Sequence, residues 1–283
     1  MFTKLQIEEF RRDGFTLFPD FFSVEEVELY RKAIEEVSAG STLEKHDGER
    51  MEMEPTQPPD GTHVRRLYEP CRFYPEFQKL SESENLLDCL EQLIGPNIML
   101  HYSKINMKPA EIGSVVEWHQ DISYYPLTNL DSLAVLFYLD DATVSNGCLK
   151  VIPGRQNSPL MNHSRDGVFQ GCVTEEVDDS QSVPIEAEAG AAIFMHCMVP
   201  HASLPNTSPQ PRRTLILSYR AADAFALYHS EMTSKNEQGI VLVRGKRASS
   251  ARFTLNEFPI PNYPRNIASL YDLQETSRKR QGH

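Results

Sequence analysis

The feature that most constrains the fold is a change of pattern near residue 96. Before this point apolar residues recur at helical spacing, and after it short apolar runs alternate with turn residues such as Asn146-Gly147 and Pro153-Gly154. Many short strands separated by such turns are typical of a β-sandwich or a barrel. We expect strands at residues 15–18, 98–108, 115–119, 132–139, 148–152, 191–197 and 213–220.

The longest uninterrupted apolar run, at residues 133–139, is far shorter than the ~20 residues that a membrane-spanning helix needs. This run is apolar on both of its faces, so it predicts a central strand that is covered on both sides. The N-terminal helices are the expected cover. We predict one at residues 5–10, one that begins at a capping box formed by Ser23 and Glu26, and one at residues 84–94.

We therefore expect a single domain over residues 1–283, mainly β with flanking helices. Its helical N-terminal part covers about residues 1–95, its β core about 96–222, and a C-terminal extension about 223–283. Residues 41–63 are polar and rich in proline. A loop of this length is either a functional lid or partly disordered.

Composition excludes several classes of function. The chain has 28 Lys and Arg against 40 Asp and Glu, a formal charge of −12, which argues against nucleic acid and against anionic membranes as partners. The five cysteines have no C-x-x-C spacing, so neither a disulfide framework nor a cysteine-type zinc site is expected. With no secretory signal at the N-terminus, we expect a cytoplasmic protein. The oligomeric state stays open, a homodimer included.

The segment His119-Gln120-Asp121 carries the clearest chemical signal. Residues i and i+2 of a strand share a face, so an imidazole and a carboxylate would lie side by side. Together they make two thirds of the 2-His-1-carboxylate triad that binds Fe(II) and leaves coordination positions open. A competing pair, His229 and Glu231, lies in a polar stretch after the last clear strand.

Two histidines are candidates for the third ligand. His196 lies within an apolar run, where a histidine is usually a structural residue with a satisfied hydrogen bond. His201 follows Pro200 at the end of a strand beside a loop, which is a better place for an open metal site. We therefore favour His201 as the ligand.

Arg212 and Arg213 begin the last core strand. A guanidinium matches a carboxylate in a bidentate manner, so one of the two would hold the far carboxylate of a keto-acid cosubstrate. The alternative is an ordinary surface charge at the end of a strand.

Taken together, these motifs resemble the phytanoyl-CoA dioxygenase family of Fe(II)/2-oxoglutarate oxygenases. The resemblance rests on five pieces in family order, and it covers most of the chain. The pieces are residues 10–15 with 21–23, residues 95–99 with 104–106, the segment His119-Gln120-Asp121 with Tyr124, Tyr125 and Pro126, residues 146–154, and residues 201–212.

The resemblance implies a distorted double-stranded β-helix, the jelly roll of cupin-like proteins. It implies that His119, Asp121 and His201 bind Fe(II), and that Arg212 holds 2-oxoglutarate. Gln120 and Ser203 match positions that contact the cosubstrate, and Phe137 stands where some members carry a tryptophan against it. Arg66 is a looser match to an upstream basic contact.

The implied reaction consumes 2-oxoglutarate and O₂, with ascorbate as a supporting reductant, and releases succinate and CO₂. It hydroxylates an unactivated C–H bond of a small molecule, either a natural product or a small carboxylic or amino acid. Asp121 argues against halogenation, because related halogenases lack this carboxylate. Two alternatives stay open: a non-redox, cupin-like metal enzyme, and a family member that has lost its activity.

The sequence contains no basic groove for a coenzyme A phosphate, so a free small molecule is the expected substrate. The charge of −12 also weighs against polyanionic substrates unless a local basic patch forms.

Overall fold

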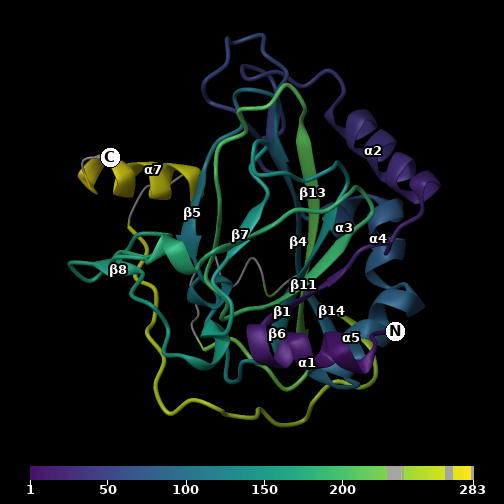
Figure 1. Ribbon diagram of the computed structural model, residues 1–283, viewed down its shortest axis with the longest axis vertical. Helices are drawn as coiled ribbons and strands as arrows, with labels where there is room; N and C mark the ends of the chain where they lie inside the picture. Colours follow the sequence, from purple (N-terminus) through teal and green to yellow (C-terminus); the bar gives the residue numbers. More distant parts are fainter. Residues whose placement is uncertain (228–236, 238, 265–269, 282–283) are drawn as a thin grey trace.

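Two antiparallel β-sheets face each other in the computed structural model, which describes residues 1–227, 237, 239–264 and 270–281 (Figure 1). The large sheet has the order β1 (Phe15–Phe18), β11 (Ala192–His196), β6 (Ser132–Tyr138), β13 (Arg212–Ala221), β4 (Ile98–Lys108), β3 (Val64–Tyr68) and β2 (Met51–Met53), and β14 (Val241–Arg244) also pairs with β4. The small sheet has the order β10 (Val183–Ile185), β7 (Leu149–Val151), β12 (His201–Ser203) and β5 (Val116–His119). A two-stranded ribbon, β8 (Ser164–Arg165) and β9 (Val168–Phe169), completes the described strands.

Each strand expected from the apolar runs is present, with bounds that differ by at most one residue from those predicted. The two facing sheets confirm the predicted jelly roll.

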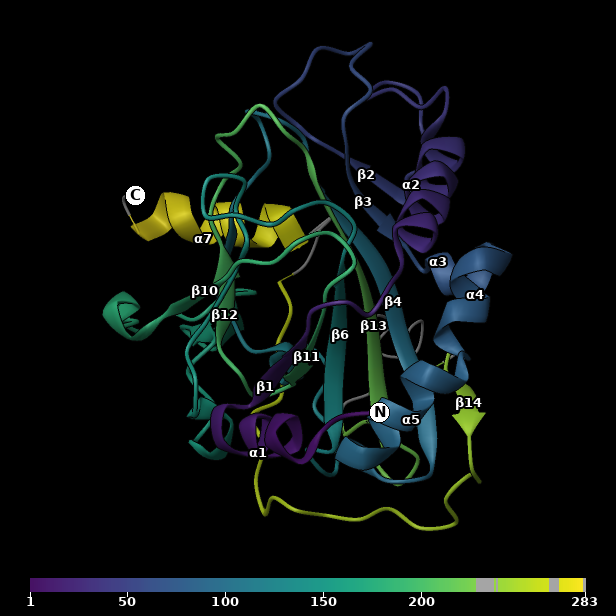
Figure 2. The same cartoon turned by 45° about the vertical axis from the view of Figure 1, so that its right-hand side comes forward.

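The helices gather on the outer face of the large sheet. They are α1 (Lys4–Asp13), α2 (Val24–Ser38), α3 (Pro70–Phe73), α4 (Pro75–Ser81) and α5 (Glu84–Ile94). Helix α7 (Leu270–Gln281) lies apart from them, against strand β5 of the small sheet. The predicted capping box is present: the Glu26 amide donates to Ser23 Oγ at 3.2 Å, and the Ser23 amide donates to Glu26 Oε2 at 2.8 Å. In Figure 2, α2, α4 and α5 lie on one side of the large sheet, and β10 and β12 lie on the other.

Strand β6 shows how alternation divides the core. All seven of its residues are buried, as the two-sided apolar run predicts, because β6 lies between β11 and β13 inside the sheet. Leu133, Val135 and Phe137 pack in the core that the helices cover. The intervening residues Ala134 and Leu136 face the small sheet instead.

The position of Phe137 corrects one prediction. Its ring stacks on that of Phe22 at 4.8 Å and contacts that of Phe21 at 5.3 Å, between the large sheet and the N-terminal segment. Since neighbouring residues of a strand point to opposite faces, Phe137 points away from the space between the sheets. It does not reach a cosubstrate bound there.

Residues 41–63, expected to form a lid or a partly disordered loop, contain a strand. Strand β2 pairs with β3, and its residues Met51 and Met53 are buried. Gln57 closes the segment, because its side chain exchanges two hydrogen bonds of 2.8 Å with the backbone of His63. The sequence signal was weak because this strand is short and its centre is Glu52.

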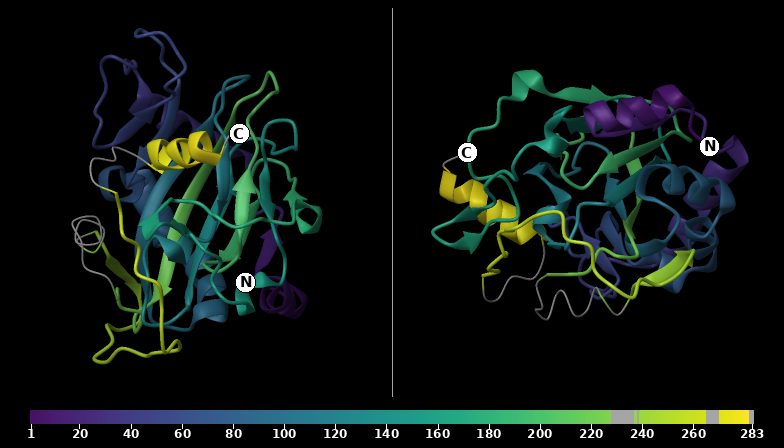
Figure 3. Two further views of the ribbon diagram at one scale, coloured as in Figure 1. Left: turned by 90° about the vertical axis from the view of Figure 1, so that its left-hand side faces the viewer. Right: turned by 90° about the horizontal axis from the view of Figure 1, so that it is seen from below.

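The C-terminal extension returns to the small sheet. Residues 245–264 run around the lower edge in Figure 1, and α7 then packs against β5. Seen from below, the two ends of the chain lie on opposite sides of the molecule (Figure 3). Among the helices that the structure describes, none is both long and apolar enough to cross a membrane.

Replacing Phe137 by alanine should lower the free energy of unfolding by about 3–5 kcal/mol, because the substitution opens a cavity in a packed aromatic cluster. Denaturant titration measures this change. Phe253→Ala is the matched control: Phe253 is 68% exposed, so the change should stay within about 0.5 kcal/mol. A Phe137 variant that keeps its stability but loses 2-oxoglutarate binding would contradict this position for the ring.

Candidate active site

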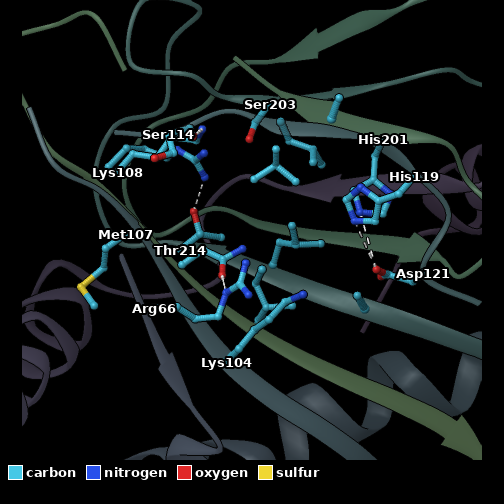
Figure 4. A pocket seen from close by; sticks show the side chains of 18 of the residues that line it. Arg66, Lys104, Met107, Lys108, Ser114, His119, Asp121, His201, Ser203 and Thr214 are labelled. Atoms are coloured by element: carbon cyan, nitrogen blue, oxygen red, sulfur yellow. Dashed lines mark hydrogen bonds and ion pairs between the residues drawn. The ribbon is translucent and has the colours of Figure 1, made fainter. Parts of the chain in front are cut away.

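A histidine pair on the two neighbouring strands β5 and β12 of the small sheet forms the basis of the site. Strands β5 and β12 pair antiparallel with His119 directly opposite His201. The Nε2 atoms of the two rings each lie 3.7 Å from Asp121 Oδ1. One ligand atom from each of the three residues falls within 4.8 Å of the others, and all three residues are buried (Figure 4).

Hydrogen bonds hold both rings in the form that binds a metal. His119 Nδ1 lies 2.7 Å from the carbonyl of Glu117, and His201 Nδ1 lies 3.0 Å from that of Val199. A carbonyl only accepts, so each Nδ1 carries the proton and each Nε2 directs a lone pair at Asp121. Burial lowers the pKa of both histidines, so they are neutral at pH 7. Two neutral imidazoles and a carboxylate are the donor set that suits Fe(II).

Asp121 reaches the histidines by a different route from the one predicted. Strand β5 ends at His119, and Asp121 begins a 3₁₀ turn, Asp121–Ser123. The Ser123 hydroxyl donates to the carbonyl of Gln120 at 2.7 Å and closes the turn. The carboxylate is therefore placed by this turn rather than by strand alternation.

Gln120, predicted to contact the cosubstrate, is fully buried beside the cavity but does not line it. Its Oε1 accepts from the amide of Met161 at 2.8 Å, and its Nε2 donates to the carbonyl of Met198 at 2.6 Å. Its own amide donates to His163 Nε2 at 3.1 Å. These bonds connect the segment that carries His119 and Asp121 to the segments around Met161 and Met198. His163, which the sequence did not predict, and Gln120 therefore support the site from behind rather than line it.

The other candidate ligands lie elsewhere. His196 Nδ1 accepts from the amide of Met198 at 3.2 Å, and its ring packs 6.2 Å from that of Phe10. It is not among the three clustered ligands, which agrees with the choice of His201. His229 and Glu231 lie outside the described residues.

The two neighbouring arginines, Arg212 and Arg213, point to opposite faces of β13. Arg212 points into the same cavity as the triad, where Nη1 donates to Thr214 Oγ1 and Nη2 to the carbonyl of Gly147, both at 2.6 Å. Arg213 points out of the cavity and forms an ion pair of 2.8 Å with Asp140. Ser203, two residues after His201 on β12, also lines the cavity.

The cavity wall is more basic than the sequence suggested. Besides Arg212, its lining includes four further cationic side chains: Arg65, Arg66, Lys104 and Lys108. They come from β3 and β4, whose pairing sets Arg66 opposite Asn106. The local basic patch that the chain's charge of −12 seemed to disfavour is therefore present. Sequence reasoning missed it because the cations converge only when these strands pair.

Burial lowers the pKa of both lysines of this wall. It lowers the pKa of Lys104 to about 8, opposed by Asp121 and reinforced by Arg66. Lys104 therefore stays mostly protonated at pH 7. Burial, and then Arg212, lowers the pKa of Lys108 well below its usual value. The ammonium of Lys108 is used locally, since it donates to the carbonyl of Leu204 at 2.7 Å and to that of Ser114.

Metal binding should distinguish the two candidate histidines. His201→Ala should weaken binding of Co²⁺, used as an air-stable substitute for Fe(II), by on the order of 100-fold, because one of three ligands is lost. His196→Ala should bind Co²⁺ as the unchanged protein does. Calorimetric titration of the metal measures both. If His196→Ala loses the metal and His201→Ala keeps it, the triad is wrongly assigned.

Comparison with known proteins supplies independent evidence. A family model described as phytanoyl-CoA dioxygenase (PhyH) matches residues 10–214. A probable alpha-ketoglutarate-dependent hypophosphite dioxygenase from Stutzerimonas stutzeri is 32% identical, over 80% of this chain and 81% of that protein. A methylphosphonate hydroxylase from Gimesia maris is 30% identical, over 77% and 81%.

Among solved structures, EctD from S. alaskensis with 2-oxoglutarate and 5-hydroxyectoine superposes with a TM-score of 0.65 at 25% identity, over 78% of this chain and 77% of that one. The family model covers well over half of this chain, and the first relative exceeds 30% identity over most of it. The chain belongs to the phytanoyl-CoA dioxygenase family of Fe(II)/2-oxoglutarate oxygenases, as its motifs predicted.

Proposed function

We propose that the protein hydroxylates a C–H bond of a small free molecule, with His119, Asp121 and His201 as the iron ligands. One observation supports this proposal above the others. The triad and Arg212 line the same cavity, so a metal site and a guanidinium for a distant carboxylate are available to one bound cosubstrate.

Each residue has a defined task in this proposal. The two imidazoles and Asp121 would hold Fe(II), and three protein ligands leave coordination positions for other groups. Arg212, oriented by Thr214 and the Gly147 carbonyl, binds the far carboxylate of 2-oxoglutarate, and Ser203 lies near enough in the lining to add a hydrogen bond.

The inner walls exclude water from the reacting atoms. Ala134, Leu136, Leu149, Met195 and Ile216 line the cavity from both sheets. A dry site strengthens the ion pair at Arg212 and limits side reactions.

The proposed reaction balances. Iron with 2-oxoglutarate and O₂ supplies an oxidant able to attack an unactivated C–H bond. One oxygen atom enters the substrate as a hydroxyl group and the other enters succinate, and the keto acid loses CO₂. The substrate and the keto acid each give up two electrons, and O₂ accepts four.

The alternatives fit the site less well. A non-redox metal enzyme does not require a guanidinium in the metal cavity, whereas a keto acid that binds the metal at one end and carries a second carboxylate does. An inactive family member is the weaker alternative, because all three candidate ligands are present and both imidazoles are oriented by hydrogen bonds from Nδ1 to carbonyls.

The relatives suggest where to look for the substrate. Two relatives that are at least 30% identical carry names that refer to hypophosphite and to methylphosphonate, which are small phosphorus oxyanions. We infer that a small molecule of this size, rather than a coenzyme A thioester, enters the cavity, and methylphosphonate is the first probe.

Turnover should be detectable with purified protein, Fe(II), ascorbate and 2-oxoglutarate. We expect slow succinate formation without a substrate, and faster formation when methylphosphonate is accepted. Succinate is measured by mass spectrometry, with Zn²⁺ in place of Fe(II) as the control. Absence of succinate together with absence of 2-oxoglutarate binding would rule out the proposed activity.

Arg212→Ala should raise the dissociation constant for 2-oxoglutarate by on the order of 100-fold, because a buried carboxylate would lose its charge-assisted partner. Arg213→Ala is the matched control. It removes the same charge one residue away on the other face of β13, so affinity for 2-oxoglutarate should not change. If Arg212→Ala and Arg213→Ala bind 2-oxoglutarate with equal affinity, Arg212 is not the residue that holds its far carboxylate.

A further inference from the structure

The cavity holds more positive charge than its cosubstrate needs. Among the described residues its lining has five cationic side chains and one carboxylate, Asp121. Two more carboxylates lie against these cations: Glu52, 3.0 Å from Arg65 and 3.5 Å from Arg66, and the buried Glu54, whose charge reaches Lys108. Asp140 also acts on Arg212, but it is already offset by its ion pair of 2.8 Å with Arg213 outside the cavity.

An excess of positive charge remains when the charges of the metal and of 2-oxoglutarate are included. Five cations against three carboxylates leave two positive charges. A divalent metal and the dianion of 2-oxoglutarate cancel each other. If Lys108 is neutral, as the lowering of its pKa by burial allows, one positive charge still remains. A buried net charge is costly unless a ligand of opposite sign offsets it.

Among the described residues, Lys104 is the cavity cation that has neither a hydrogen bond nor a carboxylate in an ion pair. Its side chain leaves β4 on the cavity face, between the strands that pair with it through Tyr68 and Ile216. Its ammonium makes no hydrogen bond and no ion pair with any residue that the structure describes, although an ammonium offers three donors. The ammonium lies 6.0 Å from the centre of the Tyr102 ring on the same strand, which does not offset its charge. Figure 4 shows Lys104 extending across the cavity floor toward Asp121, with Arg66 beside it.

Arg66 extends the same basic surface. Its Nε donates to Asn106 Oδ1 at 2.9 Å, so the amide of Asn106 fixes the guanidinium. Glu52 neutralises Arg66 only partly, because the same carboxylate also binds Arg65 and accepts from the Tyr68 hydroxyl at 2.9 Å. Arg66 lies in register with Asn106 and Thr214, between the row of Arg212 and the row of Lys104, so the basic wall continues from Arg212 to Lys104.

We propose that Lys104, supported by Arg66, is a second anion subsite that binds a small oxyanion of the prime substrate beside the metal while Arg212 binds 2-oxoglutarate. This assignment rests on the proposed function. The substrate that it implies is a small molecule with a phosphonate or carboxylate group. Anchoring that group at Lys104 sets an adjoining C–H bond next to the triad.

The test measures ligand binding in the absence of oxygen. Protein loaded with Fe(II) and saturated with 2-oxoglutarate under nitrogen is titrated calorimetrically with methylphosphonate, acetate and acetamide. Acetamide has nearly the shape of acetate without its charge. Saturating 2-oxoglutarate keeps the probes from Arg212 and from the positions on the metal that the keto acid occupies.

We expect the unchanged protein to bind at least one anion tenfold or more tightly than acetamide. Lys104→Met should raise the dissociation constant of that anion at least about tenfold, since a charge-assisted hydrogen bond is lost. The preference for the anion over acetamide should then disappear. Lys104→Arg should restore most of the affinity. Lys79→Met removes the same charge from the exposed surface of α4 and should change nothing.

The two probes also identify the oxyanion, because tighter binding of methylphosphonate or of acetate indicates a phosphonate or a carboxylate substrate. The inference is overturned if Lys104→Met binds the anions as the unchanged protein does, or if the unchanged protein prefers neither anion to acetamide. It is also overturned if Lys104→Met loses 2-oxoglutarate affinity, since Lys104 would then bind the cosubstrate. Failure of the unchanged protein to bind 2-oxoglutarate would instead remove the proposed function.

Discussion

The antiparallel pairing of β5 with β12 is the constraint on which the site depends. It sets His119 opposite His201, and each ring is then held by a carbonyl two residues earlier in its own chain segment. Because the register determines which residues face each other, a slip of one position would turn one imidazole out of the cavity. The turn at Asp121 adds the carboxylate to a pair that the sheet has already formed.

The rest of the molecule supports this pairing from outside. Helix α7 packs on β5, where Gln274 accepts from the amide of Glu117 at 3.3 Å and donates to the carbonyl of Gly171 at 2.7 Å. The carbonyl of Glu117 is the one that orients His119. Helix α7 is thus connected to His119, a proposed iron ligand, through the backbone of the single residue Glu117, although the helix lies outside both sheets.

The large sheet contributes the charge, and the small sheet contributes the histidines. Strands β3, β4 and β13 bring Arg66, Lys104 and Arg212 to one cavity, although the chain as a whole carries a charge of −12. Net charge describes long-range attraction to partners, whereas recognition of a ligand depends on the few side chains that touch it. An acidic protein can therefore hold a basic binding site, provided that the site is enclosed.

The sequence by itself determined seven of the strands, the jelly roll and the family, because apolar runs, turn residues and short motifs are local signals, but it did not reveal short strands such as β2, β3 and β12. It also favoured His201 over His196, from its position beside a loop. Only the tertiary structure decided which side chains share the cavity. Phe137 faces the helices and Gln120 bonds to backbone groups, while Lys104 reaches the cavity without a hydrogen bond or ion pair to any described residue. These outcomes depend on strand register and on contacts between residues far apart in the chain, which no local pattern encodes.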